Sequence, residues 1–262
     1  MSLNVQSTNR RSQFPENAHP AFARLRSGHF WFETRRRVIQ EVLRDLKSSE
    51  PGLTLEVGCG DGHLLDILPG RLTVGMDIQL RDLLESRRRG VCRFLIAASG
   101  DHLPFSRVFS LVCAFDVIEH LQDDVGFLRE CDSVLKRDGR LLLTVPADPA
   151  LWSHLDVYAG HQRRYTAQSM QAAMESAGLT IECMFPMFRL LWPLSFINAR
   201  LKRGHNVSDP AAEYSVGPFF NALLRCALRL EWKILGKASF GRGTSWCVVA
   251  RPSHPNLSGM QE

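Results

Sequence analysis

The sequence predicts an α/β protein whose central sheet holds seven mostly parallel strands, with helices on both faces and a helical insertion before the last strand. Three observations support this prediction. Short apolar runs alternate with helical or polar stretches, which is typical of parallel strands joined by crossover helices. A glycine-rich turn follows the first run. Finally, roughly 60 residues separate the last two runs, several times the length of an ordinary loop.

The first expected element is a helix. Its apolar spacing runs from Phe30 to Leu46, where Val38 and Val42 can share one face, and Pro51-Gly52 ends it. Five runs rich in strand-forming residues come next, at Leu53–Val57, Leu72–Met76, Val91–Ala97, Phe109–Phe115 and Arg140–Val145.

The last part of the chain adds a helix, two strands and the insertion. Thr166 is a suitable N-cap for a helix that reaches Ala177, with Gly178 just beyond its end. Strands are expected at Leu179–Phe185 and Trp246–Ala250. Between these strands the spacing predicts two helices, at Leu190–Lys202 and Phe219–Lys237.

These elements divide the chain into a disordered leader at 1–28, a domain formed by 29–187 and 241–252, an insertion at 188–240 and a disordered tail at 253–262. The insertion begins with a strongly apolar stretch. Arg189 and two prolines interrupt it before it reaches the ~18 uncharged residues of a membrane span. Two interpretations remain open for it: a lid packed on the core, or a surface that faces lipid.

Composition excludes several classes of protein. Hydrophobic residues make up 45% of the chain and charged residues 23%, as in an ordinary globular protein. The net charge of +5 comes with short arginine clusters that lack interleaved aromatic residues, so nucleic acid is not an expected partner. The seven cysteines show no CxxC spacing and the N-terminus holds no apolar signal run. We therefore expect a cytoplasmic protein, peripheral to the inner face of the membrane if the insertion faces lipid.

The sharpest motif is Glu56-Val57-Gly58-Cys59-Gly60-Asp61-Gly62, in which a predicted strand ends in three alternate glycines. Glycine lets the backbone turn tightly and approach a ligand closely. A helix expected at His63–Leu68 would offer free N–H groups to a carboxylate. Asp77 ends the second strand fifteen residues after the last of these glycines, where an acid accepts hydrogen bonds from both ribose hydroxyls.

The same region argues against a dinucleotide ligand. The dinucleotide fingerprint needs G-x-G-x-x-G, and His63 occupies the position of its third glycine. NAD is therefore disfavoured relative to a nucleoside that lacks a pyrophosphate.

Together these motifs resemble the class I S-adenosylmethionine-dependent methyltransferases, with their Rossmann-like sheet, from Leu53 to Phe185 and again at the final strand. The segment 152–165, combined with the Phe30-Trp31-Phe32 run ahead of three arginines, is similar to a group of bacterial small-molecule members. The resemblance implies that S-adenosyl-L-methionine is the cofactor. It assigns the cofactor's methionine and ribose portions to Glu56, Gly58, Cys59, Gly60, Gly62, Asp77 and Ile78.

A further segment, Ser99–Phe105, resembles the part of the family that contacts the adenine amino group. The position of the family's acid falls on Ser99 here, whereas the nearest acid is Asp101. The adenine contact therefore stays open between these two residues, which flank Gly100.

After the fourth expected strand, Asp116-Val117-Ile118-Glu119-His120 resembles the edge where the family's methyl donor meets the acceptor, so Phe115 and Asp116 are expected at the cofactor. A similar acid-x-x-Glu-His cluster is associated with a divalent cation in the ubiquinone-pathway O-methyltransferases. The alternative is the start of a helix, with acids near its positive end. We favour this alternative and expect no metal.

The segment 152–165 is dense in titratable groups and follows the fifth strand, where α/β proteins place their substrates. His161 or His154 could take a proton from an acceptor hydroxyl. Arg163 and Arg164 could bind a carboxylate or phosphate. Alternatively, they could pair with acids on an adjoining helix while Tyr165 packs in the protein interior. The expected substrate-binding residues are Trp152, Arg163, Arg164 and Tyr165.

We therefore expect methyl transfer from S-adenosyl-L-methionine to a small-molecule or lipid-like acceptor, at an oxygen atom. Transfer from a sulfonium is an in-line displacement that needs alignment and exclusion of water, so a single base can suffice. The alternatives are a non-catalytic S-adenosylmethionine-binding module and an NAD-dependent dehydrogenase.

Overall fold

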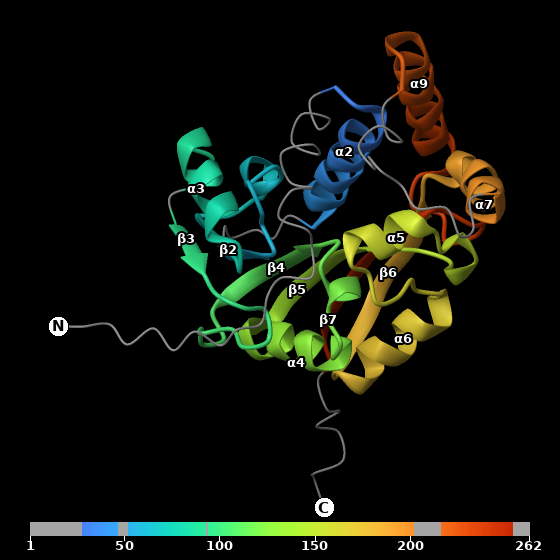
Figure 1. The fold of residues 1–262 in the computed structure, drawn as a ribbon. Coiled ribbons are helices and arrows are strands. Elements are labelled where there is room, and N and C mark those ends of the chain that lie inside the picture. The colour runs from blue at the N-terminus through green and yellow to red at the C-terminus, as the bar shows by residue number, and fades with distance from the viewer. Residues whose placement is uncertain (1–27, 47–51, 93, 202–215, 254–262) are drawn as a thin grey trace, which may run out of the picture.

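The computed structural model describes residues 28–46, 52–92, 94–201 and 216–253 (Figure 1). Nearly all of the expected leader and tail lies outside these ranges, as does the link at 202–215 between the two expected helices of the insertion. The division of the chain into domain and insertion therefore stays a prediction at its boundaries.

A seven-stranded sheet forms the centre of the fold, with the strand order β3-β2-β1-β4-β5-β7-β6. The first five strands pair in parallel, and β7 runs antiparallel to both of its neighbours, β5 and β6. This confirms the predicted fold class. The strands are β1 Leu53–Val57, β2 Leu72–Asp77, β3 Phe94–Ala97, β4 Phe109–Phe115, β5 Leu135–Pro146, β6 Leu179–Met187 and β7 Ser245–Pro252.

Helices cover both faces of the sheet, as Figure 1 shows. Their bounds are α2 Phe30–Asp45, α3 Leu80–Arg89, α4 Asp124–Val134, α5 His154–Ala159, α6 Ala167–Ser176, α7 Trp192–Leu201 and α9 Pro218–Leu235. Four single turns of 3₁₀-helix connect them, η1 Leu65–Ile67, η2 Ile118–His120, η3 Pro149–Leu151 and η4 Arg189–Leu191.

Two hydrophobic cores form, one on each face of the sheet. On one face α4 and α6 bury side chains such as Phe127 and Met170 against the strands. On the other face α2 buries Ile39 and Val42, and α9 packs against α2. Complete burial of a large apolar side chain stabilises the fold by about 1.5–3 kcal/mol. These cores fix the strand ends, and hence the loops that follow them.

The prediction of an α-helix at His63–Leu68 is wrong, because the structure has only the 3₁₀ turn η1 there. Pro69 explains the early end, since a residue before proline avoids the helical region and Leu68 is extended at ψ 133°. The third strand also begins later than expected, at Phe94. The helix capped by Thr166 is confirmed, with Gly178 beyond its end at φ +79°.

The insertion contains the two expected helices, α7 and α9. The large apolar residues just before α7 extend the core, since Phe185, Met187 and Phe188 are buried. Asn221 ties α9 to the start of α2, because its side chain accepts from the Phe30 backbone N–H at 2.7 Å. Within the described residues, no helix is both long enough and apolar enough to cross a membrane.

Candidate active site

A cavity of about 1290 Å³ lies at the carboxyl ends of the parallel strands. Its walls include Gly58 after β1, Asp77 at the end of β2, Asp116 after β4 and Pro146 at the end of β5. Open α/β sheets bind ligands at this edge, where the strand order reverses on either side of the first strand. The cavity is therefore the candidate active site.

The glycine turn has the backbone geometry that the sequence predicts for a ligand-binding loop. Gly58 adopts φ +72° and Gly60 φ +53°, which are left-handed values that side-chain-bearing residues rarely adopt. A Cβ on Gly58 would lie 2.4 Å from a methyl carbon of Val117, so this position is closed to any side chain. A Cβ on Gly60 would meet nothing within 4 Å, so the space in front of it is open.

The Asp77 carboxylate is fixed in the cavity wall by two backbone groups. The Gly60 N–H donates to Oδ2 at 2.7 Å, and the Gln79 N–H donates to Oδ1 at 2.8 Å. Ile78 lines the cavity beside it. This acid therefore joins the glycine turn to the end of β2, which is the arrangement expected of a ribose-binding residue.

Both candidates for the adenine contact line the cavity, together with Gly100. The Ser99 hydroxyl donates to the Asp101 carboxylate at 3.1 Å, and the Asp101 N–H donates to the same hydroxyl at 3.3 Å. The Ser99 hydroxyl and the Asp101 carboxylate are therefore hydrogen-bonded to each other at the cavity wall. Which of the two contacts adenine stays open.

Four of the residues predicted to hold the cofactor are not part of the cavity lining: Glu56, Cys59, Gly60 and Gly62. Burial raises the pKa of the Glu56 carboxyl well above its usual range. Its Oε2 atom has no hydrogen-bond donor among the described residues. A buried carboxyl in this condition has hydrogen-bonding capacity left for a polar ligand group that approaches the glycine turn.

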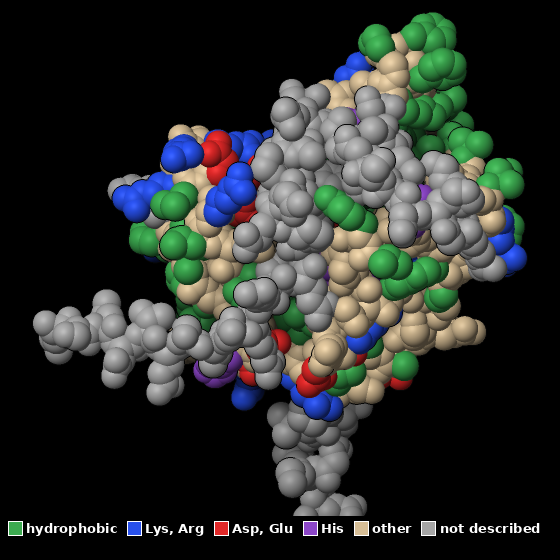
Figure 2. Space-filling model, viewed as in Figure 1, with side chains coloured by type: hydrophobic (Ala, Val, Ile, Leu, Met, Phe, Trp, Pro, Cys, Tyr) green, Lys and Arg blue, Asp and Glu red, His purple; other side chains and the backbone are tan. Residues whose placement is uncertain are grey.

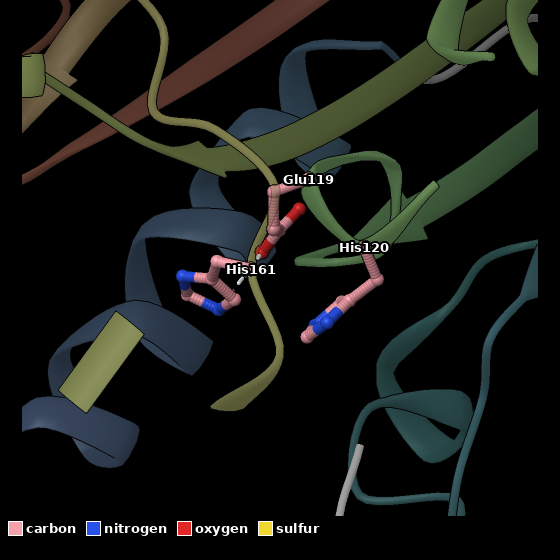
Figure 3. Close-up of side chains that lie close together, drawn as sticks. All are labelled: Glu119, His120 and His161. Atoms are coloured by element: carbon pink, nitrogen blue, oxygen red, sulfur yellow. Dashed lines mark ion pairs between the residues drawn. The ribbon is translucent and has the colours of Figure 1, made fainter. Parts of the chain in front are cut away.

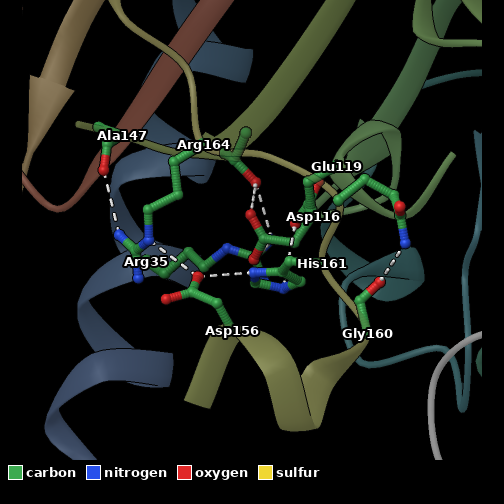
Figure 4. Close-up of polar contacts among 10 residues, drawn as sticks. Arg35, Asp116, Glu119, Ala147, Asp156, Gly160, His161 and Arg164 are labelled. Atoms are coloured by element: carbon green, nitrogen blue, oxygen red, sulfur yellow. Dashed lines mark hydrogen bonds and ion pairs between the residues drawn. The ribbon is translucent and has the colours of Figure 1, made fainter. Parts of the chain in front are cut away.

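Arg35 was not among the site residues expected from the sequence, where it belongs to one of the short arginine clusters. The Arg35 guanidinium lies 2.7 Å from Asp116 Oδ2 and donates to the Thr144 hydroxyl at 2.7 Å (Figure 4). That hydroxyl donates in turn to Asp116 Oδ1 at 3.0 Å. Arg35 is buried on α2 and stacks over Trp31, with 5.1 Å between guanidinium carbon and ring centre. A cation is thus built into the cavity wall opposite the end of β4.

A second polar group holds His161 in place (Figure 4). Its Nδ1 lies 2.8 Å from Asp156 Oδ1, and Arg164 Nε donates to the same oxygen at 2.8 Å. Burial alone would raise the pKa of Asp156, but the bond from His161 and the charge of Arg164 hold it below its usual value. A buried carboxylate on Nδ1 fixes the orientation of the imidazole. The ring lines the cavity, and its Nε2 lies 3.9 Å from Glu119 Oε1.

His161 also meets the cluster that follows β4 (Figure 3). Ligand atoms of Glu119, His120 and His161 lie within 4.8 Å of one another, close enough to hold a metal ion. Asp116, which the sequence analysis grouped with these residues, is paired with Arg35 instead. Burial and the nearby Asp116 raise the pKa of Glu119 well above its usual range. Burial and the neighbouring His161 lower the pKa of His120 to about 4.

Four other predicted residues are not part of the cavity lining: Trp152, His154, Arg163 and Tyr165. Arg163 is paired with Asp124 of α4 at 2.8 Å. The Tyr165 hydroxyl donates to the same carboxylate at 2.9 Å, and burial raises the pKa of this tyrosine. The structure thus agrees with the alternative interpretation for these two residues. Arg164 and His161 do line the cavity.

Part of the cavity wall is apolar, and some of it belongs to the insertion that was expected to form a lid. It comes from the first turn of α2 and from η4 and α7. The apolar wall includes Trp31, Phe32, Leu191 and Leu194. For its α2 part, the aromatic run before the three arginines was the signal available in the sequence.

The parallel sheet with one antiparallel strand, the glycine turn and the acid after β2 define a class I methyltransferase fold. A family model described as a methyltransferase domain matches residues 28–184. The chain belongs to this family, and S-adenosylmethionine is its cofactor.

Comparison with individual proteins gives the same class. A protein of Mycolicibacterium smegmatis described as a probable S-adenosylmethionine-dependent methyltransferase is 26% identical over 184 residues, which cover 68% of this chain and 70% of that one. A ubiquinone biosynthesis O-methyltransferase of Dinoroseobacter shibae is 31% identical over 123 residues, 41% of this chain and 47% of that one. A solved S-adenosylmethionine-dependent methyltransferase of Thermotoga maritima aligns with a TM-score of 0.59 at 17% identity, covering 91% and 97% of the two chains, and so shares the fold.

Proposed function

We propose that this enzyme methylates an oxygen atom of a small-molecule or lipid-like acceptor, with His161 as the general base. The observation that carries the proposal is the bond between His161 Nδ1 and buried Asp156 at 2.8 Å. An imidazole that donates from Nδ1 to a carboxylate has a lone pair on Nε2, which can accept the proton of a hydroxyl. His154, the other candidate, is not part of the cavity lining.

The remaining residues of the cavity have complementary tasks. Bound S-adenosylmethionine supplies an electrophilic methyl group on a sulfonium. The glycine turn and Asp77 hold the cofactor on one side of the cavity, whereas Trp31, Phe32 and Leu194 give the other side an apolar wall. Such a wall excludes water and favours an acceptor with an apolar portion.

Two further observations support the proposal. The cavity of about 1290 Å³ exceeds the roughly 300–1000 Å³ of typical ligand pockets, so it has room for cofactor and acceptor together. The relative from Dinoroseobacter shibae is described as an O-methyltransferase, which favours oxygen as the accepting atom. A non-catalytic binding module and an NAD-dependent dehydrogenase are the competing functions.

The test is a product assay for S-adenosylhomocysteine with a panel of phenols and alcohols. His161→Ala should lower kcat by about 10²–10⁴-fold, the usual contribution of a general base, and should leave cofactor affinity unchanged. Asp156→Asn should lower kcat while His154→Ala, the matched control, should leave it within a few-fold. Turnover by His161→Ala equal to the parent would contradict the assignment. Cofactor binding with no product from any acceptor would favour the binding module.

A further inference from the structure

Helix α9 carries an apolar stripe on its outer face. Phe219, Leu223, Leu230 and Ile234 are separated by four, seven and four residues, so they share one side of the helix. Their exposed fractions lie between 53% and 74%. The opposite side is buried, because Leu228 packs in the core beneath α2. The helix is therefore apolar on two faces, and only one of them is covered by the described residues.

Helix α7 continues this exposed surface. Leu194, Ile197 and Leu201 are 62%, 54% and 74% exposed, and Phe240 in the loop after α9 is 65% exposed. Figure 2 shows the hydrophobic side chains gathered over α9 and along the adjoining edge. Single exposed apolar residues need no explanation, but a surface that extends over two helices marks an interaction site. We call these residues of α7, α9 and the loop the apolar face.

The charges beside the apolar face are mostly basic. Between Arg189 and Arg242 the described residues include seven basic side chains and one acid, Glu231. That acid is buried, and it accepts from the backbone N–H groups of Arg189 and Leu190 at 2.9 and 2.8 Å. Arg229 and Lys233 are exposed beside the apolar stripe, and no ion pair joins them to a described acid. They line a hollow with three more basic residues and with two acids of α2, which pair with Arg37 and Lys237. The surface is thus apolar with a basic rim.

This combination selects an anionic lipid bilayer over a second copy of the chain. In a symmetric dimer the same patch would face itself, which would bring the basic rims of both copies together. A membrane with anionic headgroups would instead take the apolar side chains below the headgroup level and pair with the rim. Leu194 connects the face to the site, because it is exposed and also lines the cavity.

We infer that α7 and α9 dock this protein on an anionic bilayer, with the cavity mouth at the lipid surface. The part of the inference that concerns the acceptor, namely that it is presented from the membrane, rests on the proposed function. The docking itself does not rest on it.

The experiment is co-sedimentation of the full chain with vesicles of phosphatidylcholine alone and of phosphatidylcholine with phosphatidylglycerol. The parent should bind the anionic vesicles, and binding should weaken as salt rises. Phe219→Ser/Leu223→Ser/Ile234→Ser should lower the partition coefficient at least about tenfold, since each buried apolar side chain adds to membrane affinity. Arg229→Glu/Lys233→Glu should remove the preference for anionic lipid. The control variant is Leu84→Ser/Phe94→Ser, which changes two exposed apolar residues of α3 and of β3, the strand at the far end of the sheet from β6. It should bind vesicles as the parent does.

Calorimetric binding of S-adenosylmethionine to each variant verifies its fold. Equal vesicle binding by the parent and the triple variant would overturn the inference, as would a parent dimer in light scattering that the triple variant converts to monomer. The vesicle assay contains no methyl acceptor, so its result tests membrane docking independently of the proposed methyl transfer. A chain that binds vesicles but forms no S-adenosylhomocysteine would contradict only the proposed function.

Discussion

The guanidinium of Arg35 on α2 lies 2.7 Å from the carboxylate of Asp116 at the end of β4. Asp116 adopts φ +55°, a strained backbone value for a residue with a side chain. The ion pair and the two bonds through Thr144 hold that conformation. A helix from the start of the described chain is thereby attached to the strand edge where transfer is proposed to occur.

Arg35→Met should destabilise the protein by about 1–3 kcal/mol, because it leaves the Asp116 carboxylate and the Thr144 hydroxyl without their cation. This loss of stability is smaller than that expected for a fully buried ion pair, because the Asp116 side chain is 27% exposed and solvent screens the charges. Urea unfolding of Arg35→Met, Asp116→Asn and the double variant measures the coupling. Strictly additive effects would show that the pair contributes nothing.

Activity should survive exhaustive chelation. The Glu119, His120 and His161 atoms are close enough for a metal, but the nearby Arg35 guanidinium disfavours a second positive charge. The measurement is S-adenosylhomocysteine formation after dialysis against EDTA. Loss of activity that Mg²⁺ or Zn²⁺ restores would contradict this prediction and would make these three residues a metal site.

Glu119→Gln should become more stable relative to the parent as pH rises. Burial raises the pKa of Glu119 in the folded state, so the folded protein binds a proton that the unfolded chain releases above about pH 4.5. The stability that Glu119 contributes is therefore lost as pH rises from 4.5 through the folded pKa. The free energy of unfolding, measured from pH 5 to 9, should fall more steeply for the parent than for the variant. Parallel profiles would mean that Glu119 is ionised in the folded state.

The fold was predictable because it depends on local patterns. The glycine turn, the capping residue Thr166 and the alternation of apolar runs each specify an element without distant contacts. The wrong helix prediction at His63–Leu68 also has a local cause, because Pro69 in the sequence disfavours a helix that continues to Leu68. Only the sheet order required the three-dimensional fold.

The site was harder to predict because its key contacts join distant segments. Arg35 belongs to a run of three arginines, and its partner Asp116 lies 81 residues away in the sequence, so local spacing did not indicate their ion pair. Asp156 was overlooked although it forms a capping box with Ser153. Whether His154 or His161 faces the cavity depends on how the short helix α5 is placed, which local spacing does not determine.

The most direct test of the central claim, that the cavity binds S-adenosylmethionine through the glycine turn and Asp77, is isothermal titration of the parent and of Asp77→Ala. The parent should bind S-adenosylmethionine and not NAD. Asp77→Ala should lose about 1–3 kcal/mol, or roughly 5–150-fold in Kd, through the lost ribose bonds. Gly60→Arg should abolish binding by filling the open space, and Asp138→Ala, on an exposed residue of β5, should change nothing. Unchanged affinity in Asp77→Ala with an intact circular dichroism spectrum, or binding of NAD in place of S-adenosylmethionine, would contradict the account.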